Sequence, residues 1–116
     1  MVKIISTVKD NKAFASVEMA GEIEVIAAEI GGALSSAYNQ IKEQDKNAAK
    51  MFRFLLTELI SNEQSPMWDT CKDRDTVCRA AIVRKGAKLT GDDIADLLRR
   101  GTPKDIIKSL LEEMEA

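Results

Sequence analysis

Side chains that could do chemistry are few in this chain, and one type is missing altogether. The 116 residues include no histidine, which removes the commonest general base and the commonest metal ligand. Cys71 and Cys78 are seven residues apart, about 10 Å along a helix, which is too far for a disulfide. A zinc site would need two carboxylates beside these thiols. We therefore expect free, buried and inert thiols, and no bound metal.

The acidic residues offer one spacing that resembles a metal site, and it fails. Asp73 and Asp75 begin the pattern of a calcium-binding loop, but Cys78 stands where that loop needs glycine. Arg84 stands where it needs a bidentate glutamate. The sequence contains no glycine-rich phosphate loop and no nucleophile elbow. We expect a protein that is not an enzyme and that uses no cofactor.

A short basic segment raises the question of an anionic partner. Between residues 76 and 91 there is no acid, but Arg79, Arg84, Lys85 and Lys88 are present. The whole chain has 17 cations against 19 acids, a net charge of −2, and dedicated nucleic-acid binders carry a positive excess. We therefore expect an ordinary solvated surface and no nucleic-acid partner. The alternative is a nucleic-acid-associated regulator that uses residues 79–88, with an anion patch at Arg84, Lys85 and Lys88.

One face of a predicted helix consists of small residues. Ala28, Gly31, Gly32, Ser35 and Ser36 lie opposite the large apolar side chains of that helix. Each glycine inside a helix costs about 1 kcal/mol relative to alanine, so two adjacent glycines indicate close approach of another backbone. We favour a neighbour from the same chain. A second copy or another protein is the alternative partner, and a solvated face is the third interpretation.

The only tryptophan, Trp68, lies in a segment of loop composition. An exposed tryptophan can anchor a protein partner, because aromatic residues dominate binding hot spots. A tryptophan can also fold back as a lid on the core, with its ring buried and its N–H paired. The lid is the commoner arrangement, and the sequence leaves both open.

The elements that position these residues begin with two strands and two helices. Residues 2–8 and 13–19, joined by a polar connection, predict a β-hairpin. Apolar residues at three- and four-residue steps predict helices over 22–43 and 46–62, with Asp45 as the N-cap of the second. The short connection predicts an antiparallel helical hairpin. The second helix carries one apolar stripe, formed by Ala48, Met51, Phe52, Leu55, Leu56, Leu59 and Ile60.

The C-terminal half is less regular. Residues 76–84 are typical of either a helix capped by Asp73 or Asp75, or a strand, and both stay open. Thr90 and Thr102 each precede a short amphipathic helix.

The length of the chain predicts one domain over residues 1–116. Within this domain, the sequence favours a weak boundary at residues 61–73, before a small C-terminal helical part, because Pro66 and its neighbours interrupt the helical pattern. No apolar run is long enough to span a bilayer, and the first residues lack the features of a secretory signal. We expect a cytoplasmic protein.

The order of strand, long helix and second helix, followed by Ser-Pro-Met-Trp-Asp at 65–69, resembles small uncharacterised proteins encoded by prophages and bacteriophages. The resemblance covers residues 14–69. It implies a bacterial or phage cytoplasmic setting and an accessory role.

Together these patterns predict a mostly helical α+β fold. We expect an N-terminal β-hairpin packed on the helical hairpin, with two or three shorter C-terminal helices. The predicted function is non-enzymatic: the protein binds another protein or itself, for example as a homodimer.

Overall fold

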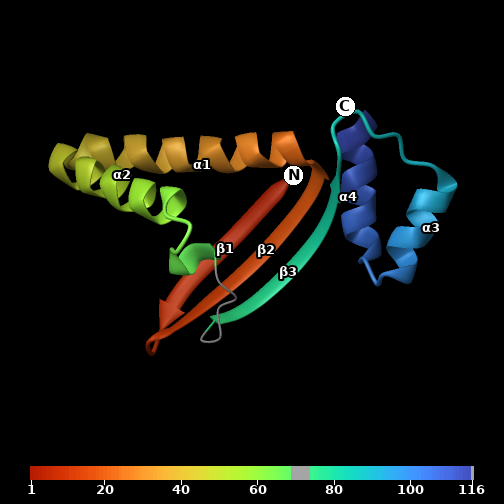
Figure 1. Cartoon of the computed structure of the whole chain (residues 1–116), viewed down its shortest axis with the longest axis horizontal. Helices are drawn as coiled ribbons and strands as arrows, with labels where there is room; N and C mark the ends of the chain where they lie inside the picture. Colours follow the sequence, from red (N-terminus) through yellow and green to blue (C-terminus); the bar gives the residue numbers. More distant parts are fainter. Residues whose placement is uncertain (69–73, 116) are drawn as a thin grey trace. The chain divides into compact units, whose positions relative to one another are not determined.

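The computed structural model describes residues 1–68 and 74–115. These residues form both α-helices and β-strands (Figure 1). Within this described part, three strands form one sheet and four α-helices accompany it, which confirms the predicted fold class. The chain divides into two compact units. The sheet unit comprises Met1–Ile30 and Asp73–Ala116, and the hairpin unit comprises Gly31–Lys72.

The sheet unit begins with the expected β-hairpin. Strands β1 (Val2–Lys9) and β2 (Lys12–Glu22) pair antiparallel. Asp10 and Asn11 form the two-residue turn between them, with φ of 52° and 62°. These left-handed conformations are the ones a type I′ hairpin turn requires, and Asp and Asn tolerate them better than most residues. The prediction of a hairpin at this point is confirmed.

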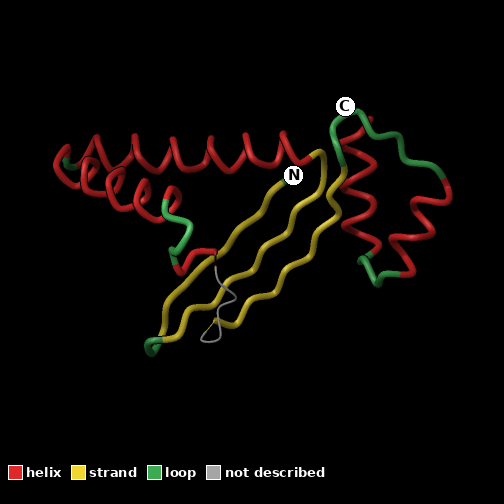
Figure 2. Tube along the Cα trace, in the orientation of Figure 1, coloured by secondary structure: helices red, strands yellow, loops and turns green. Residues whose placement is uncertain are grey.

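The third strand, β3 (Arg74–Val83), settles the open choice for the basic segment. It pairs parallel with β2, on the side of β2 away from β1 (Figure 2). The helical alternative over 76–84 is therefore wrong. Val77, Ile82 and Val83 are β-branched, and such residues favour a pleated strand over a helix. Asp75 lies within β3 and caps no helix, whereas Asp73 lies outside the described residues.

The core of the sheet unit lies between the sheet and helix α4 (Lys104–Glu115), which contacts β2 and β3 (Figure 1). Ala20 of β2 pairs with Ala81 of β3, and both are fully buried against Ile106 and Leu110 of α4. The two alanines leave room for the larger helix side chains to approach the strands. The C-terminal helix therefore belongs to the core of this unit.

Helix α3 (Gly91–Arg99) begins where the sequence predicts, directly after Thr90. The Thr90 hydroxyl accepts a hydrogen bond from the Asp93 N–H, and the Asp93 carboxylate accepts bonds from the Thr90 N–H and hydroxyl, both at 2.9 Å. This capping box satisfies donors at the helix start. The hydrogen bonds from Thr90 lower the pKa of Asp93 below its ordinary value. After the helix, Gly101 takes a left-handed conformation, with φ of 80°.

The hairpin unit consists of two helices and a short turn. Helix α1 (Ile23–Gln44) enters this unit at Gly31, and helix α2 (Lys46–Ser61) follows after the single residue Asp45. The Asp45 carboxylate accepts hydrogen bonds from the N–H groups of Asn47 and Ala48, so the predicted N-cap is confirmed. The turn η1 (Pro66–Trp68) ends the described part of this unit.

Candidate interaction surfaces

An open groove runs between α1 and α2 in the hairpin unit. It has a volume of about 500 Å³. Its apolar walls are Leu34 and Tyr38 of α1 and Phe52, Leu56 and Ile60 of α2. All five side chains are half-buried or exposed, so the two helices do not close on one another. The remaining lining residues are small or polar: Gly31, Ser35, Arg53, Thr57 and Ser61.

A second apolar surface lies beside this groove on α2. We call Met51, Leu55 and Leu59 the α2 stripe. These residues recur every four positions, so they fall within about 80° of the helix circumference. Their exposed fractions are 58%, 53% and 42%. The apolar arc of α2 thus spans about half of the helix, and one neighbouring helix cannot cover it.

The small-residue face of α1 is also open. A Cβ added at Gly31 or Gly32 would meet no atom within 4 Å in the described part of the chain, and Ala28, Ser35 and Ser36 are exposed. Among the described residues of the hairpin unit, no neighbour packs on this face, so the expectation of a neighbouring helix there is wrong. Packing of the face by the β-hairpin of the same chain stays a prediction. Of this face, only Gly31 and Ser35 line the groove, and the other groove-lining residues of α1 are Leu34 and Tyr38. Packing by a second copy or another protein stays a prediction.

Trp68 is 55% exposed, and its neighbour Met67 is similarly open. The expectation of a buried lid is therefore wrong. The backbone N–H of Trp68 donates a hydrogen bond to the Ser65 carbonyl at 3.1 Å, which closes the turn. In this turn the small Ser65 is buried, whereas the larger side chains of Met67 and Trp68 are exposed. The exposed indole fits the alternative of a partner anchor, which stays a prediction.

The sheet unit has an apolar face of its own. Ala20 and Ala81 point toward α4, and side chains alternate along a strand, so the next residues point the other way. The register places Ile4 and Val8 of β1 on that far face, together with Ile82 of β3. All three are exposed. Because β1 is also an edge strand, this side of the sheet offers both apolar side chains and backbone groups to a partner.

Arg79, the first cation of the basic segment, forms ion pairs with two acidic residues of the sheet unit. Its guanidinium donates to Glu18 at 2.8 Å and also to Asp105 in the first turn of α4. These two carboxylates raise the pKa of Arg79 further above its ordinary value. The triad joins α4 to the two strands beneath it, which gives Arg79 a structural role.

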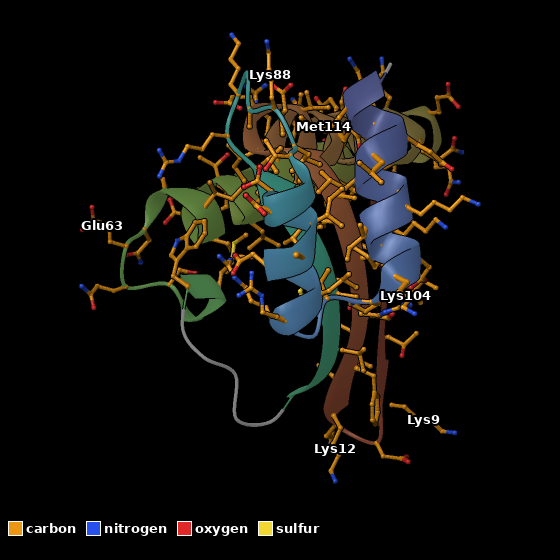
Figure 3. The ribbon with its side chains drawn as sticks, turned by 90° about the vertical axis from the view of Figure 1, so that its right-hand side faces the viewer. Lys9, Lys12, Glu63, Lys88, Lys104 and Met114 are labelled. Atoms are coloured by element: carbon orange, nitrogen blue, oxygen red, sulfur yellow. The ribbon has the colours of Figure 1, made fainter. Side chains whose placement is uncertain are left out.

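The other cations of the segment, Arg84, Lys85 and Lys88, are exposed after β3. Arg84 and Lys88 line a recess that Asp93 and Asp96 share, so its charge is mixed. Lys88 lies level with the end of α4, whereas Lys104 lies at the start of that helix (Figure 3). The cations are therefore spread over the unit. The anion patch stays a prediction, and no observation on the described residues favours it.

Among the described residues, no group of three or more Cys, Asp and Glu side chains is placed to hold a metal ion. Cys78 is exposed, so the expectation of a buried thiol is wrong for this residue. It falls on the open face of the sheet, which the sequence did not reveal. Cys71 lies outside the described residues. Within the described part, no helix is long and apolar enough to cross a membrane.

The comparisons with known proteins add no relative. No family model, no curated protein and no solved structure matches the chain. The resemblance to small prophage proteins stays a prediction. The candidate sites therefore rest on the geometry of the two units.

Proposed function

We propose that this protein is a non-enzymatic interaction protein, which acts by binding another protein chain through its helical hairpin. The observation that carries the proposal is the α2 stripe, three large apolar side chains exposed in a row beside an open apolar groove. Exposed apolar surface of this kind, on a helix face, is typical of helix-in-groove recognition and of helix bundles.

The small core leads to the same conclusion. In the described part, only Ile106 and Leu110 are large side chains that are fully buried, and both belong to the sheet unit. Burying one leucine or methionine side chain contributes about 1.5–3 kcal/mol. The three side chains of the α2 stripe are already about half buried, so covering the rest of them would contribute roughly 2–5 kcal/mol, compared with the 5–15 kcal/mol that stabilises a typical domain.

Several narrower expectations stay part of this proposal. They are the accessory role in a phage or bacterial setting, the cytoplasmic location, and the packing of the β-hairpin on the helical hairpin. The absence of histidine and of a catalytic motif in the sequence supports the non-enzymatic assignment.

A photocrosslinking experiment tests the proposal. A photoreactive amino acid is placed at Leu59 in the stripe and, as a matched control, at Lys50, a solvent-exposed position on the same helix. Irradiation in a lysate at native concentration is expected to join position 59, but not position 50, covalently to a protein chain, either a copy of this one or another. An irradiated sample with no adduct from position 59 would contradict the proposal.

A further inference from the structure

We infer that the α-ammonium group of Met1 is a structural cation of the sheet unit, and that this unit is fully packed only while that nitrogen carries its charge. The inference concerns the sheet unit alone and does not depend on what binds the hairpin unit. Its starting observation is that acceptors from β2, α1 and α4 converge on this one nitrogen.

The Met1 nitrogen has a partner for each of its donors. It donates to the Ala20 carbonyl of β2 at 2.6 Å. It lies 3.4 Å from a carboxylate oxygen of Glu29, in the part of α1 that belongs to the sheet unit, and 3.2 Å from one of Glu113 on α4. An ammonium group has three N–H donors and no acceptor. These three partners therefore use its full donor capacity.

The nitrogen is held in place by groups other than its ionic partners. The Ala20 N–H donates to the Met1 carbonyl at 2.8 Å, so the pairing of β1 with β2 continues through Met1. The Met1 side chain is 16% exposed and packs against the buried core of the unit. Ion pairs between long surface side chains are weak partly because both chains lose freedom when they pair. That cost is reduced here, because the strand and the core already position the cation.

Helix α4 contains no cation of its own at the end where its dipole favours one. Its last turn has no basic residue and includes Glu112 and Glu113. Negative charge is unfavourable at the C-terminal end of a helix, whereas a cation there is stabilising. The Met1 ammonium group supplies this cation from the start of β1, and it contacts the Glu113 carboxylate.

The same charge keeps two carboxylates together. Glu29 and Glu113 both contact one nitrogen, so their negative charges lie close to each other and repel once that nitrogen is neutral. An acylated nitrogen keeps a single N–H, which is enough for the Ala20 carbonyl and leaves no donor for the carboxylates. Loss of the charge therefore releases the last turn of α4 and the adjoining part of α1, while the strand pairing survives.

The test compares the full chain with a free and with an acetylated α-amino group. Both are made by chemical synthesis with ligation at Cys71, so that they differ at this nitrogen alone. Acetylation is expected to lower the midpoint of urea unfolding, measured by circular dichroism, and to speed amide hydrogen exchange in the last turn of α4. A chain with a methylated α-amino group is the matched control. It adds bulk but keeps the charge, and it is expected to stay closer to the free chain.

Glutamine variants keep the inference falsifiable if the acetylated chain fails to fold. In the chain with the free amino group, Glu113→Gln is expected to lower the midpoint. Glu112→Gln makes the same charge change at an exposed position of the same helical turn, and it is expected not to lower the midpoint. In the acetylated chain, Glu113→Gln should instead raise the midpoint, because it removes the repulsion with Glu29.

Two results would overturn the inference. One is an acetylated chain with the urea midpoint and the α4 exchange rates of the free chain. The other is an equal effect of Glu113→Gln and Glu112→Gln on the free chain, because the Met1 ammonium group contacts only the first of these two carboxylates among the described residues.

Discussion

The two units of this molecule treat their apolar residues in opposite ways. The sheet unit closes a core between two strands and α4, where Ile106 and Leu110 are fully buried. Among the described residues of the hairpin unit, the only buried hydrophobic residue is Ala49. A sheet and a helix make two layers from one chain, whereas two helices with wide apolar arcs need further helices to cover them. The described part of the hairpin unit therefore has little buried apolar surface of its own to stabilise it.

The largest expected effect is in the sheet unit. Leu110→Ala removes a fully buried side chain from the core beside Ala20 and Ala81. We expect a loss of about 2–5 kcal/mol in the free energy of unfolding, because a cavity adds to the lost transfer energy. Urea denaturation followed by circular dichroism measures the loss.

Leu59→Ala in the hairpin unit is the matched control for that substitution. Leu59 is 42% exposed in the single chain, so its truncation is expected to matter only where the α2 stripe is covered. The destabilisation of the purified chain should therefore be much smaller than that of Leu110→Ala. A loss as large as that of Leu110→Ala would contradict the contrast between the units.

The cap of α2 tests how much local structure supports the hairpin unit. Asp45→Ala removes the acceptor for the N–H groups of Asn47 and Ala48, and we expect a cost of about 1 kcal/mol and reduced helicity. Asp45→Asn keeps an oxygen acceptor and should behave almost like the original protein. Far-ultraviolet circular dichroism during denaturation compares the two. Equal behaviour of both variants would show that this cap contributes nothing.

The open small face of α1 gives a substitution that should stabilise. Gly32→Ala adds a methyl group into free space within a helix, so we expect a gain of about 0.5–1 kcal/mol with no change in mass. Gly101→Ala is the opposite control, because its φ of 80° strains any side chain, and it should destabilise. Denaturation curves of both variants provide the measurement. A loss of stability in Gly32→Ala would mean that something does pack on this face.

The smallest expected effect is the pH response of the α3 cap in the sheet unit. Hydrogen bonds from Thr90 lower the pKa of Asp93 in the folded state below its unfolded value, about 3.9. The stabilisation is therefore complete above that pH and is lost as the pH falls through the folded pKa. A chemical-shift titration of the Asp93 carboxyl from pH 6 to pH 2 reports this pKa. A midpoint at or above 3.9 would exclude the capping contribution.

Local signals in the sequence predicted most of the elements. The turn at Asp10 and Asn11 and the caps at Asp45 and Thr90 depend on neighbours within a few residues, so the printed sequence contains all the necessary information. Strand β3 was left undecided because its partner β2 lies more than fifty residues earlier, and a parallel pairing leaves no turn signal between them.

The exposure of apolar residues was harder to predict than their periodicity. The pattern placed Met51, Leu55 and Leu59 on the apolar side of α2, but a helical period does not say what lies opposite. The width of the arc was the available signal, because one neighbouring helix cannot cover half of a helix. For the same reason, the sequence did not distinguish a covered from an open face at Gly32, or a buried from an exposed indole at Trp68.

Hydrogen exchange of the backbone amides in the purified chain tests the contrast between the two units most directly. Amides of α4 near Leu110 should exchange slowly, because this helix packs on the closed core of the sheet unit. Amides of α2 near Leu55 should exchange much faster, because few buried contacts oppose opening of that helix. Equal protection of the two helices would contradict the contrast between the units.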